Sequence, residues 1–168
     1  MDVAVWLVCG VTAIVASVLA RRSRRAMVVG RVAVGVLMLV GGAVVNAAYL
    51  WFGLRDYAAF ADPVHFGWVT DTWRSVVAPH QAVFINLLIA FEAVVGILIL
   101  SGGRRTQLGL VAAIGFHAAL WLFGWIETVY VLVMLPPLVL LLLAERRAGS
   151  APAPGGRPQT RVPAGPPA

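Results

Sequence analysis

The chain has 168 residues, of which 61% are hydrophobic and 12% are charged, and its formal net charge is +6. A soluble domain carries about 25% charged residues, and a water-soluble fold of this length would not bury so much apolar surface. The composition therefore excludes an ordinary soluble domain and favours a membrane protein. All 13 basic residues are arginines that mostly flank apolar segments, which favours membrane lipids over nucleic acid as their partners.

The first predicted element is an apolar segment over residues 3–20, with four arginines following it within residues 21–25. A cleaved signal peptide carries positive charge before its apolar stretch, whereas here Asp2 precedes the stretch and the positive charge follows it. This order predicts a retained transmembrane helix with the N-terminus outside, and residues 1–26 form an N-terminal unit. The single cysteine, Cys9, excludes an intramolecular disulfide.

The second predicted transmembrane helix spans about residues 27–52, which is long enough to cross a bilayer with some tilt. Gly35, Gly42 and Asn46 fall on one face at helical spacing. Glycines on one face allow two helix backbones to approach closely in lipid. This face is therefore predicted to pack against another helix.

Residues 53–80 form a different kind of segment, in which aromatic side chains alternate with charged ones. Such mixtures belong at the boundary between membrane and water. The four-residue repeat of apolar side chains predicts a short interfacial helix over 67–77 on the outer side, ended by Pro79. His65 and His80 lie in this segment without the spacing of a metal site, so no metal is predicted.

Three further transmembrane helices are predicted over about residues 81–101, 107–124 and 128–144. The last two together are too long for a single crossing of a hydrocarbon core about 30 Å thick, so we place a turn at Gly124. Pro136-Pro137 is expected to kink the last helix, which a helical bundle tolerates.

Residues 145–168 are rich in proline, glycine and arginine and are predicted to be a disordered tail. Five crossings place the tail inside the cell together with 11 of the 13 arginines, leaving only Arg55 and Arg74 outside. The positive-inside rule therefore predicts a plasma-membrane protein with a cytoplasmic C-terminus.

Two ionisable residues fall in the middle of predicted transmembrane helices. An ionisable group at that depth costs roughly 2.5–3.5 kcal/mol on insertion scales, so it needs a partner or a function. Glu92 and His117 lie at similar depths on antiparallel neighbours, and we expect a hydrogen bond between them. Asn46 and Asn86 lie nearer the outer side, and Trp121 lies one turn beyond His117. These five residues form the predicted pocket.

Two interpretations of this pocket stay open. It is either a ligand site for a small redox lipid such as a quinone, with Glu92 and His117 as proton carriers and Trp121 stacked on the ring, or a buried polar pair that fixes the helix register. No glycine-rich phosphate loop, HExxH motif or catalytic triad order occurs in the sequence.

Two segments of the sequence resemble a known family. Arg31–Gly42 reads RVAVGVLMLVGG and Glu92–Arg105 reads EAVVGILILSGGRR; both are similar to helix patterns of the DoxX/DoxD-like membrane proteins. The resemblance covers about 30–144 and implies a four-helix bundle, with Glu92 as the position carried over. One branch of that family is a small membrane subunit of a thiosulfate:quinone oxidoreductase. The chain departs from the family in its additional N-terminal helix, its long aromatic outer segment, and Asn46, near where relatives often place a basic residue.

The sequence therefore predicts an all-α, five-helix membrane protein in which residues 27–144 form a DoxX-like bundle. The expected function is that of a small membrane component of a redox or quinone-linked complex, with a protein partner supplying the redox centre. The first alternative is a non-enzymatic scaffold that recruits a partner through its outer segment or its tail. The second is a small transporter, for which a chain of this length would have to act as a homo-oligomer.

Overall fold

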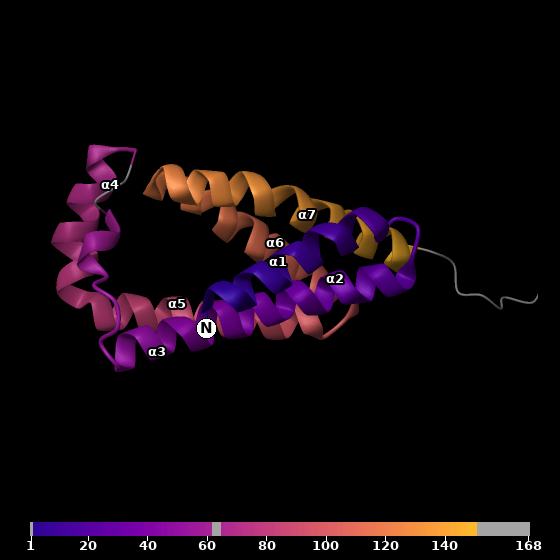
Figure 1. The fold of residues 1–168 in the computed structure, drawn as a ribbon, viewed down its shortest axis with the longest axis horizontal. Helices are drawn as coiled ribbons and strands as arrows, with labels where there is room; N and C mark the ends of the chain where they lie inside the picture. The colour runs from indigo at the N-terminus through magenta and orange to yellow at the C-terminus, as the bar shows by residue number, and fades with distance from the viewer. Residues whose placement is uncertain (1, 62–64, 151–168) are drawn as a thin grey trace, which may run out of the picture.

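The computed structural model describes residues 2–61 and 65–150, and within these ranges the chain forms helices and no strand (Figure 1). The predicted all-α fold is confirmed. The bundle has one end rich in arginine, where α1 (Asp2–Leu19) meets α2 (Arg24–Val36). The opposite end is rich in aromatic side chains and is crossed by α4 (Gly67–Thr72). We refer to these as the arginine-rich end and the aromatic end.

The first two long helices are an antiparallel pair. α1 covers Asp2–Leu19. After a short turn, a second helix runs without interruption through α2 (Arg24–Val36), the π-helical segment η1 (Leu37–Val44) and α3 (Val45–Trp51). The Ser23 side chain caps the start of α2 by accepting a hydrogen bond from the Ala26 amide, which satisfies one of the free donors of the first helical turn.

The segment that crosses the aromatic end continues directly into the next long helix. Its elements are η2 (Ala58–Ala61), α4 (Gly67–Thr72), η3 (Trp73–Val77), η4 (Ala78–His80) and α5 (Gln81–Leu100). Residues 67–77 are helical as predicted, and α4 lies across the end of the bundle (Figure 1). The prediction that Pro79 ends this helix is wrong. Pro79 occupies the first turn of η4, where its missing N–H is not needed, so the chain changes direction and helical structure continues.

The last two long helices meet at the predicted turn. α6 covers Gly103–Leu120 and is extended by η5 (Trp121–Phe123), and α7 covers Trp125–Ser150. Gly124 between them has φ of +122°, a conformation that L-residues with side chains rarely adopt. α7 continues through Pro136-Pro137.

Two predicted boundaries differ from the structure. α6 starts at Gly103 rather than near residue 107, because Arg104 and Arg105 are good helix formers that extend the helix beyond its apolar part. α7 continues to Ser150 rather than ending at 144. The expectation of disorder from residue 145 is therefore wrong for 145–150, and the rest of the tail lies outside the described residues.

The five long helices pack in a closed ring in which α1 contacts both α2 and α7, α2 contacts α5, α5 contacts α6, and α6 contacts α7. One close approach joins α2 and α5. A Cβ added to Gly96 would lie 3.0 Å from the carbonyl oxygen of Gly35. The predicted glycine-mediated packing of this face is confirmed for Gly35, in line with the preference of membrane helices for small residues at contacts.

Within residues 2–61 and 65–150, four helices are long and apolar enough to cross a membrane: Arg24–Trp51, Gly67–Leu100, Gly103–Phe123 and Trp125–Gly149. The apolar part of α1, Ala4–Leu19, is shorter. Together with large exposed apolar side chains along the outside of these helices, this identifies a multi-pass integral membrane protein.

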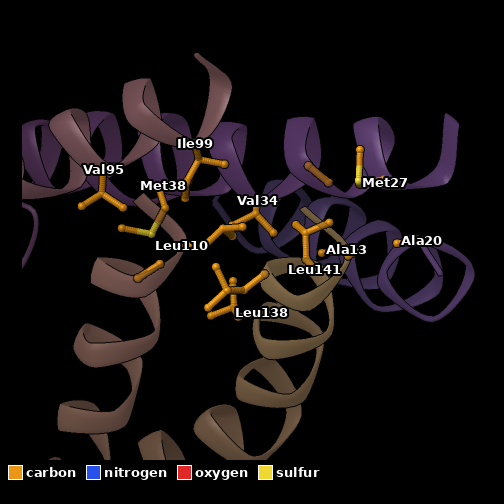
Figure 2. Close-up of a cluster of buried hydrophobic side chains, with 14 residues drawn as sticks. Ala13, Ala20, Met27, Val34, Met38, Val95, Ile99, Leu110, Leu138 and Leu141 are labelled. Carbon is orange, nitrogen blue, oxygen red and sulfur yellow. The ribbon is translucent and has the colours of Figure 1, made fainter. Parts of the chain in front are cut away.

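The buried hydrophobic cluster occupies the part of the bundle nearer the arginine-rich end, which we call the packed half (Figure 2). Side chains from α1, α2, η1, α5, α6 and α7 meet there, and Ile99, Leu110, Leu138 and Leu141 are 0% exposed. The packed half holds the five helices in register and so fixes the geometry of the rest of the bundle.

Candidate functional site

The other half of the bundle encloses a cavity of about 370 Å³ that extends from the aromatic end down to Glu92. We call this part the hollow half. Side chains from all five long helices and the aromatic-end segment line the cavity: Trp6, Gly41, Val45, Asn46, Tyr49, Arg55, Tyr57, Phe60, Trp73, Ile85, Leu88, Glu92, Phe116, Leu120, Ile126, Glu127 and Tyr130. Its volume is within the range of small-molecule sites, and its lining is mostly apolar and aromatic with a few polar groups, as such sites are.

Glu92 on α5 lines the cavity and is 5% exposed. The side-chain amide of Asn46 donates a hydrogen bond to Glu92 Oε2 over 2.9 Å. The carboxyl group lies against the backbone of Gly42, where an added Cβ would be 2.7 Å from Oε1. Gly42 belongs to the π-helical segment η1, and π-helical segments inside α-helices occur frequently at functional sites. A glycine is therefore required opposite Glu92.

A hydrogen-bonded chain connects Glu92 to the aromatic end through Asn46 and Tyr57. The Tyr57 hydroxyl donates to Asn46 Oδ1 over 3.1 Å, and the Trp73 indole donates to the carbonyl oxygen of Tyr57 over 2.8 Å. Burial raises the pKa of Tyr57, while the nearby Arg55 guanidinium lowers it. The net shift is upward, so the hydroxyl stays protonated and remains a donor to Asn46 at neutral pH.

The predicted hydrogen bond between Glu92 and His117 is wrong. His117 Nδ1 lies 2.7 Å from the carbonyl oxygen of Ala113, and Nε2 lies 3.0 Å from the Tyr130 hydroxyl. Because a carbonyl only accepts, Nδ1 carries a proton, and in the neutral ring Nε2 accepts from Tyr130. Tyr130 on α7 lines the cavity and His117 does not. The carboxyl and the imidazole therefore have separate partners.

Aromatic side chains form the walls of the cavity. The rings of Trp6 and Tyr130 meet edge to face with centroids 5.1 Å apart. At the aromatic end, the Arg55 guanidinium lies 5.8 Å from the ring centroid of Tyr49 and 5.6 Å from that of Phe60. These distances are within the range of cation–π attraction. The cationic side chain thus lies near the aromatic rings at this end of the cavity.

Glu127 also lines the cavity, at the start of α7. Its Oε2 atom is buried and has no hydrogen-bond partner. Its place in the sequence, three residues after Gly124, predicts a hydrated residue at the outer mouth of the bundle. A buried polar atom without a partner costs free energy, about 1–3 kcal/mol, unless another molecule satisfies it. Glu127 is therefore a second carboxylate able to bind a ligand.

Two of the five predicted pocket residues lie elsewhere. Asn86 is exposed on the outside of α5, where its amide donates to the carbonyl oxygen of Ala82. Trp121 is 44% exposed and packs against the rings of His65 and Phe66 rather than facing the cavity. Of the predicted set, the structure brings together Asn46 and Glu92. His117 lies behind the cavity wall, where it is hydrogen bonded to the lining residue Tyr130.

The two histidines of the aromatic-end segment are apart from this site. His65 Nε2 is hydrogen bonded to the Thr128 hydroxyl over 2.9 Å, and its ring packs on Trp125. Among residues 2–61 and 65–150, no group of three or more histidine, cysteine or acidic side chains is arranged to hold a metal ion.

Sequence reasoning missed the tyrosines that organise the site. Tyr57 lies in a segment outside the predicted transmembrane helices, so no helical spacing relates it to Asn46. Tyr130 lies among apolar residues of the last helix, and nothing in the sequence distinguishes it from a packing residue. Only the spacing of Glu127 and Tyr130, three residues apart on one helical face, links these two cavity residues in the sequence.

The polar groups deep in the cavity are arranged mainly to accept hydrogen bonds. The Tyr130 hydroxyl proton points to His117, so its oxygen is left as an acceptor, and the Glu92 carboxyl is held by Asn46 as an acceptor. The cavity is thus suited to a flat or apolar molecule that carries a donor group.

Comparison with known proteins gives no match to a protein-family model, a curated protein or a solved structure.

Proposed function

We propose that this chain is a ligand-binding integral membrane protein whose cavity receives the ring of a lipid-soluble aromatic molecule, with a hydroquinone as the first candidate. The observation that carries the proposal is the Glu92 carboxyl at the base of an aromatic-lined cavity inside the bundle. A packed membrane helix bundle has no need of an ionisable group at this depth, and such groups mark ligand or proton pathways.

The chemistry of the cavity matches a hydroquinone in three respects. A ring hydroxyl would donate to Glu92, the aromatic walls would contact both faces of the ring, and the hydrogen-bonded chain through Asn46 and Tyr57 supplies polar groups from Glu92 to the aromatic end. A buried carboxylate is also a suitable acceptor for the proton that a hydroquinone loses on oxidation.

The chain would act with a partner. Oxidation of a hydroquinone releases two electrons and two protons, and the sequence carries no cofactor motif to accept the electrons. A redox protein would accept them, and this chain would be the small membrane subunit that holds the ligand, as in the quinone-linked branch of the DoxX-like proteins it resembles. In this arrangement the protein lies in the plasma membrane and its arginine-rich end faces the cytoplasm.

Ligand binding can be measured by tryptophan fluorescence. Trp6 and Trp73 line the cavity, so a short-tailed hydroquinone added to the protein in nanodiscs should quench their emission. Its oxidised form should need a higher concentration to reach half of its own maximal quenching. Glu92→Gln should weaken hydroquinone binding about tenfold, because a hydrogen bond to a charged acceptor contributes about 1.5–3 kcal/mol.

Asn86→Ala is the matched control for Asn46→Ala, since both remove a carboxamide from a membrane helix and only Asn46 lines the cavity. Asn46→Ala should weaken binding and Asn86→Ala should leave it unchanged. Equal binding by the wild type, Glu92→Gln and Asn46→Ala would refute the proposal. A folded protein that extracts no aromatic lipid from its membrane would instead favour the scaffold.

A second class of ligand is favoured by Glu127. Two carboxylates and several aromatic rings in one cavity also suit an amphipathic organic cation, because ring faces attract ammonium groups. Glu127→Gln separates the two classes. It should weaken binding of a tetraalkylammonium probe and leave hydroquinone binding at Glu92 within about twofold. Transport of the cation across sealed vesicles would favour the small-transporter alternative.

A further inference from the structure

A second and larger cavity, of about 1180 Å³, lies at the arginine-rich end. It is lined by the turn between α1 and α2, the first turns of α2, the start of α6 and the last turns of α7. The charged side chains that line it are seven arginines and a single glutamate, namely Arg21, Arg22, Arg24, Arg31, Arg104, Arg146, Arg147 and Glu145. Four separate segments thus bring positive charge to one concave surface.

The deepest basic residue of this cavity is held in place by the glutamate. Arg31 Nη1 lies 3.8 Å from Glu145 Oε1, and the two side chains are 21% and 5% exposed. Arg31 Nε and Glu145 Oε1 are both buried and have no hydrogen-bond partner, so the pair attract each other without a hydrogen bond between these atoms. An arginine has five N–H donors, and the Arg31 guanidinium is therefore positioned with donor capacity left over.

The occupant of the cavity must be an anion. Residues 151–168, which follow α7, contain two arginines and no acidic side chain, so this segment has the wrong charge to fill the cavity. Arginine recognises phosphate through paired N–H donors. A phosphate ester therefore matches both the charge and the donor geometry.

The position of the cavity favours a lipid over a soluble phosphate compound. The cavity lies where helices that cross the membrane begin and end, at the level of the lipid head groups. Val28 lines the cavity and is 36% exposed, and Leu19, beside the lining residue Ala20, is 50% exposed. A head group bound among the arginines would leave its acyl chains against these apolar side chains.

We propose that the arginine-rich cavity binds the phosphate group of an anionic membrane lipid between α2, α6 and α7, with Arg31 at its base. Basic pockets between transmembrane helices bind such head groups in other membrane proteins. This site is independent of the Glu92 cavity, from which it is separated by the packed half.

Neighbouring arginines provide matched variants for the test. Arg24 and Arg104 line the cavity, whereas the adjacent Arg25 and Arg105 do not, and all four side chains are exposed. Arg24→Gln and Arg25→Gln remove the same charge from the same helical turn, as do Arg104→Gln and Arg105→Gln. A positioned site distinguishes the members of each pair, and a diffuse surface potential does not.

The measurement is native mass spectrometry of the full chain in detergent with phosphatidylglycerol or cardiolipin and an equal amount of phosphatidylcholine. The wild type should retain the anionic lipid. Arg24→Gln and Arg104→Gln should each reduce its occupancy about fivefold, and Arg25→Gln and Arg105→Gln less than about twofold. Equal losses in both members of each pair, or equal retention of phosphatidylcholine, would overturn the proposal.

Two further probes identify the source of the phosphate. Inorganic phosphate that binds in phosphatidylcholine nanodiscs with the same dependence on Arg24 and Arg104 would support the phosphate site and assign it to a soluble compound. A short RNA that binds with this dependence, while anionic lipid does not, would overturn the lipid assignment.

Discussion

The helices pack against one another differently in the two halves of the bundle. In the packed half, glycines on α2, α5 and α6 let the helices approach until backbone atoms touch, and a Cβ on Gly109 would lie 2.8 Å from the backbone nitrogen of Ile99. In the hollow half, bulky aromatic side chains hold the helices around a cavity. Lipid tails offer little hydrophobic driving force between helices, so tight packing in the packed half must supply most of the stability of the bundle.

The largest effect is expected from truncating the centre of the packed half. Leu138→Ala would leave a cavity next to Leu141 and Leu110 that the surrounding helices cannot fill by collapse. Such truncations cost about 2–5 kcal/mol in soluble proteins. We expect about 3 kcal/mol here, in the lower part of this range because lipid tails already solvate the unfolded helices. Unfolding in mixed micelles of increasing dodecyl sulfate, followed by circular dichroism, measures the loss. A loss below about 0.5 kcal/mol would contradict the assignment of stability to this half.

The next effect is expected at the close contact between α2 and α5. Gly96→Ala places a Cβ 3.0 Å from the Gly35 carbonyl oxygen and 2.6 Å from Leu39 Cγ, so α2 and α5 must separate. The expected cost is about 1–3 kcal/mol. Gly115→Ala is the control, because nothing lies within 4 Å of its Cβ and the better helix propensity of alanine should stabilise the protein by up to about 1 kcal/mol. The same unfolding assay should therefore show shifts of opposite sign.

The sequence does not reveal how each helix is rotated about its own axis. Charge placement and apolar length are averaged over whole segments, so they predicted the helices and the glycine face. Asn86 and Glu92 lie six residues apart, which turns their side chains roughly 120° away from each other. Ile85 and Leu88, at seven and four residues from Glu92, share its face and line the cavity. The depth of a residue was predictable, but depth alone does not bring side chains together.

The hydrogen bond of His117 to Tyr130, in place of the predicted one to Glu92, could not be predicted from residue depth either. Phe116 and Leu120, four residues apart, form the cavity face of α6, and His117 is turned away from it toward Tyr130. The position of α7 relative to α6 decides this, and it depends on the turn at Gly124 and on packing around Leu138. Such long-range geometry leaves no periodic signal in an apolar sequence.

A smaller effect is expected within the polar chain of the hollow half. Asn46→Ala removes the donor to Glu92 and the side-chain acceptor of Tyr57, whose hydroxyl keeps the backbone carbonyl oxygen of residue 46 at 3.3 Å. The Glu92 carboxyl that loses its donor and the weakened Tyr57 hydrogen bond should together destabilise the fold by about 1–2 kcal/mol. Asn86→Ala removes only a bond to its own helix backbone, so a change within about 0.5 kcal/mol is expected. If both variants lose the same stability, the Tyr57–Asn46–Glu92 chain does not form in the membrane.

The smallest effect on stability is expected from enlarging a side chain that faces the cavity. Leu88 is half-buried and lines the hollow half, so Leu88→Phe can extend into the cavity without moving a helix, and the unfolding free energy should change by about 0.5 kcal/mol or less. The same enlargement in the packed half, Leu110→Phe, has no space available and should cost about 1–3 kcal/mol. Leu88→Phe should nevertheless abolish quenching by the hydroquinone, since the added ring occupies the volume of the ligand. If Leu88→Phe destabilises the protein as much as Leu110→Phe does, both halves are equally filled. That result would contradict the cavity and with it the proposed binding site.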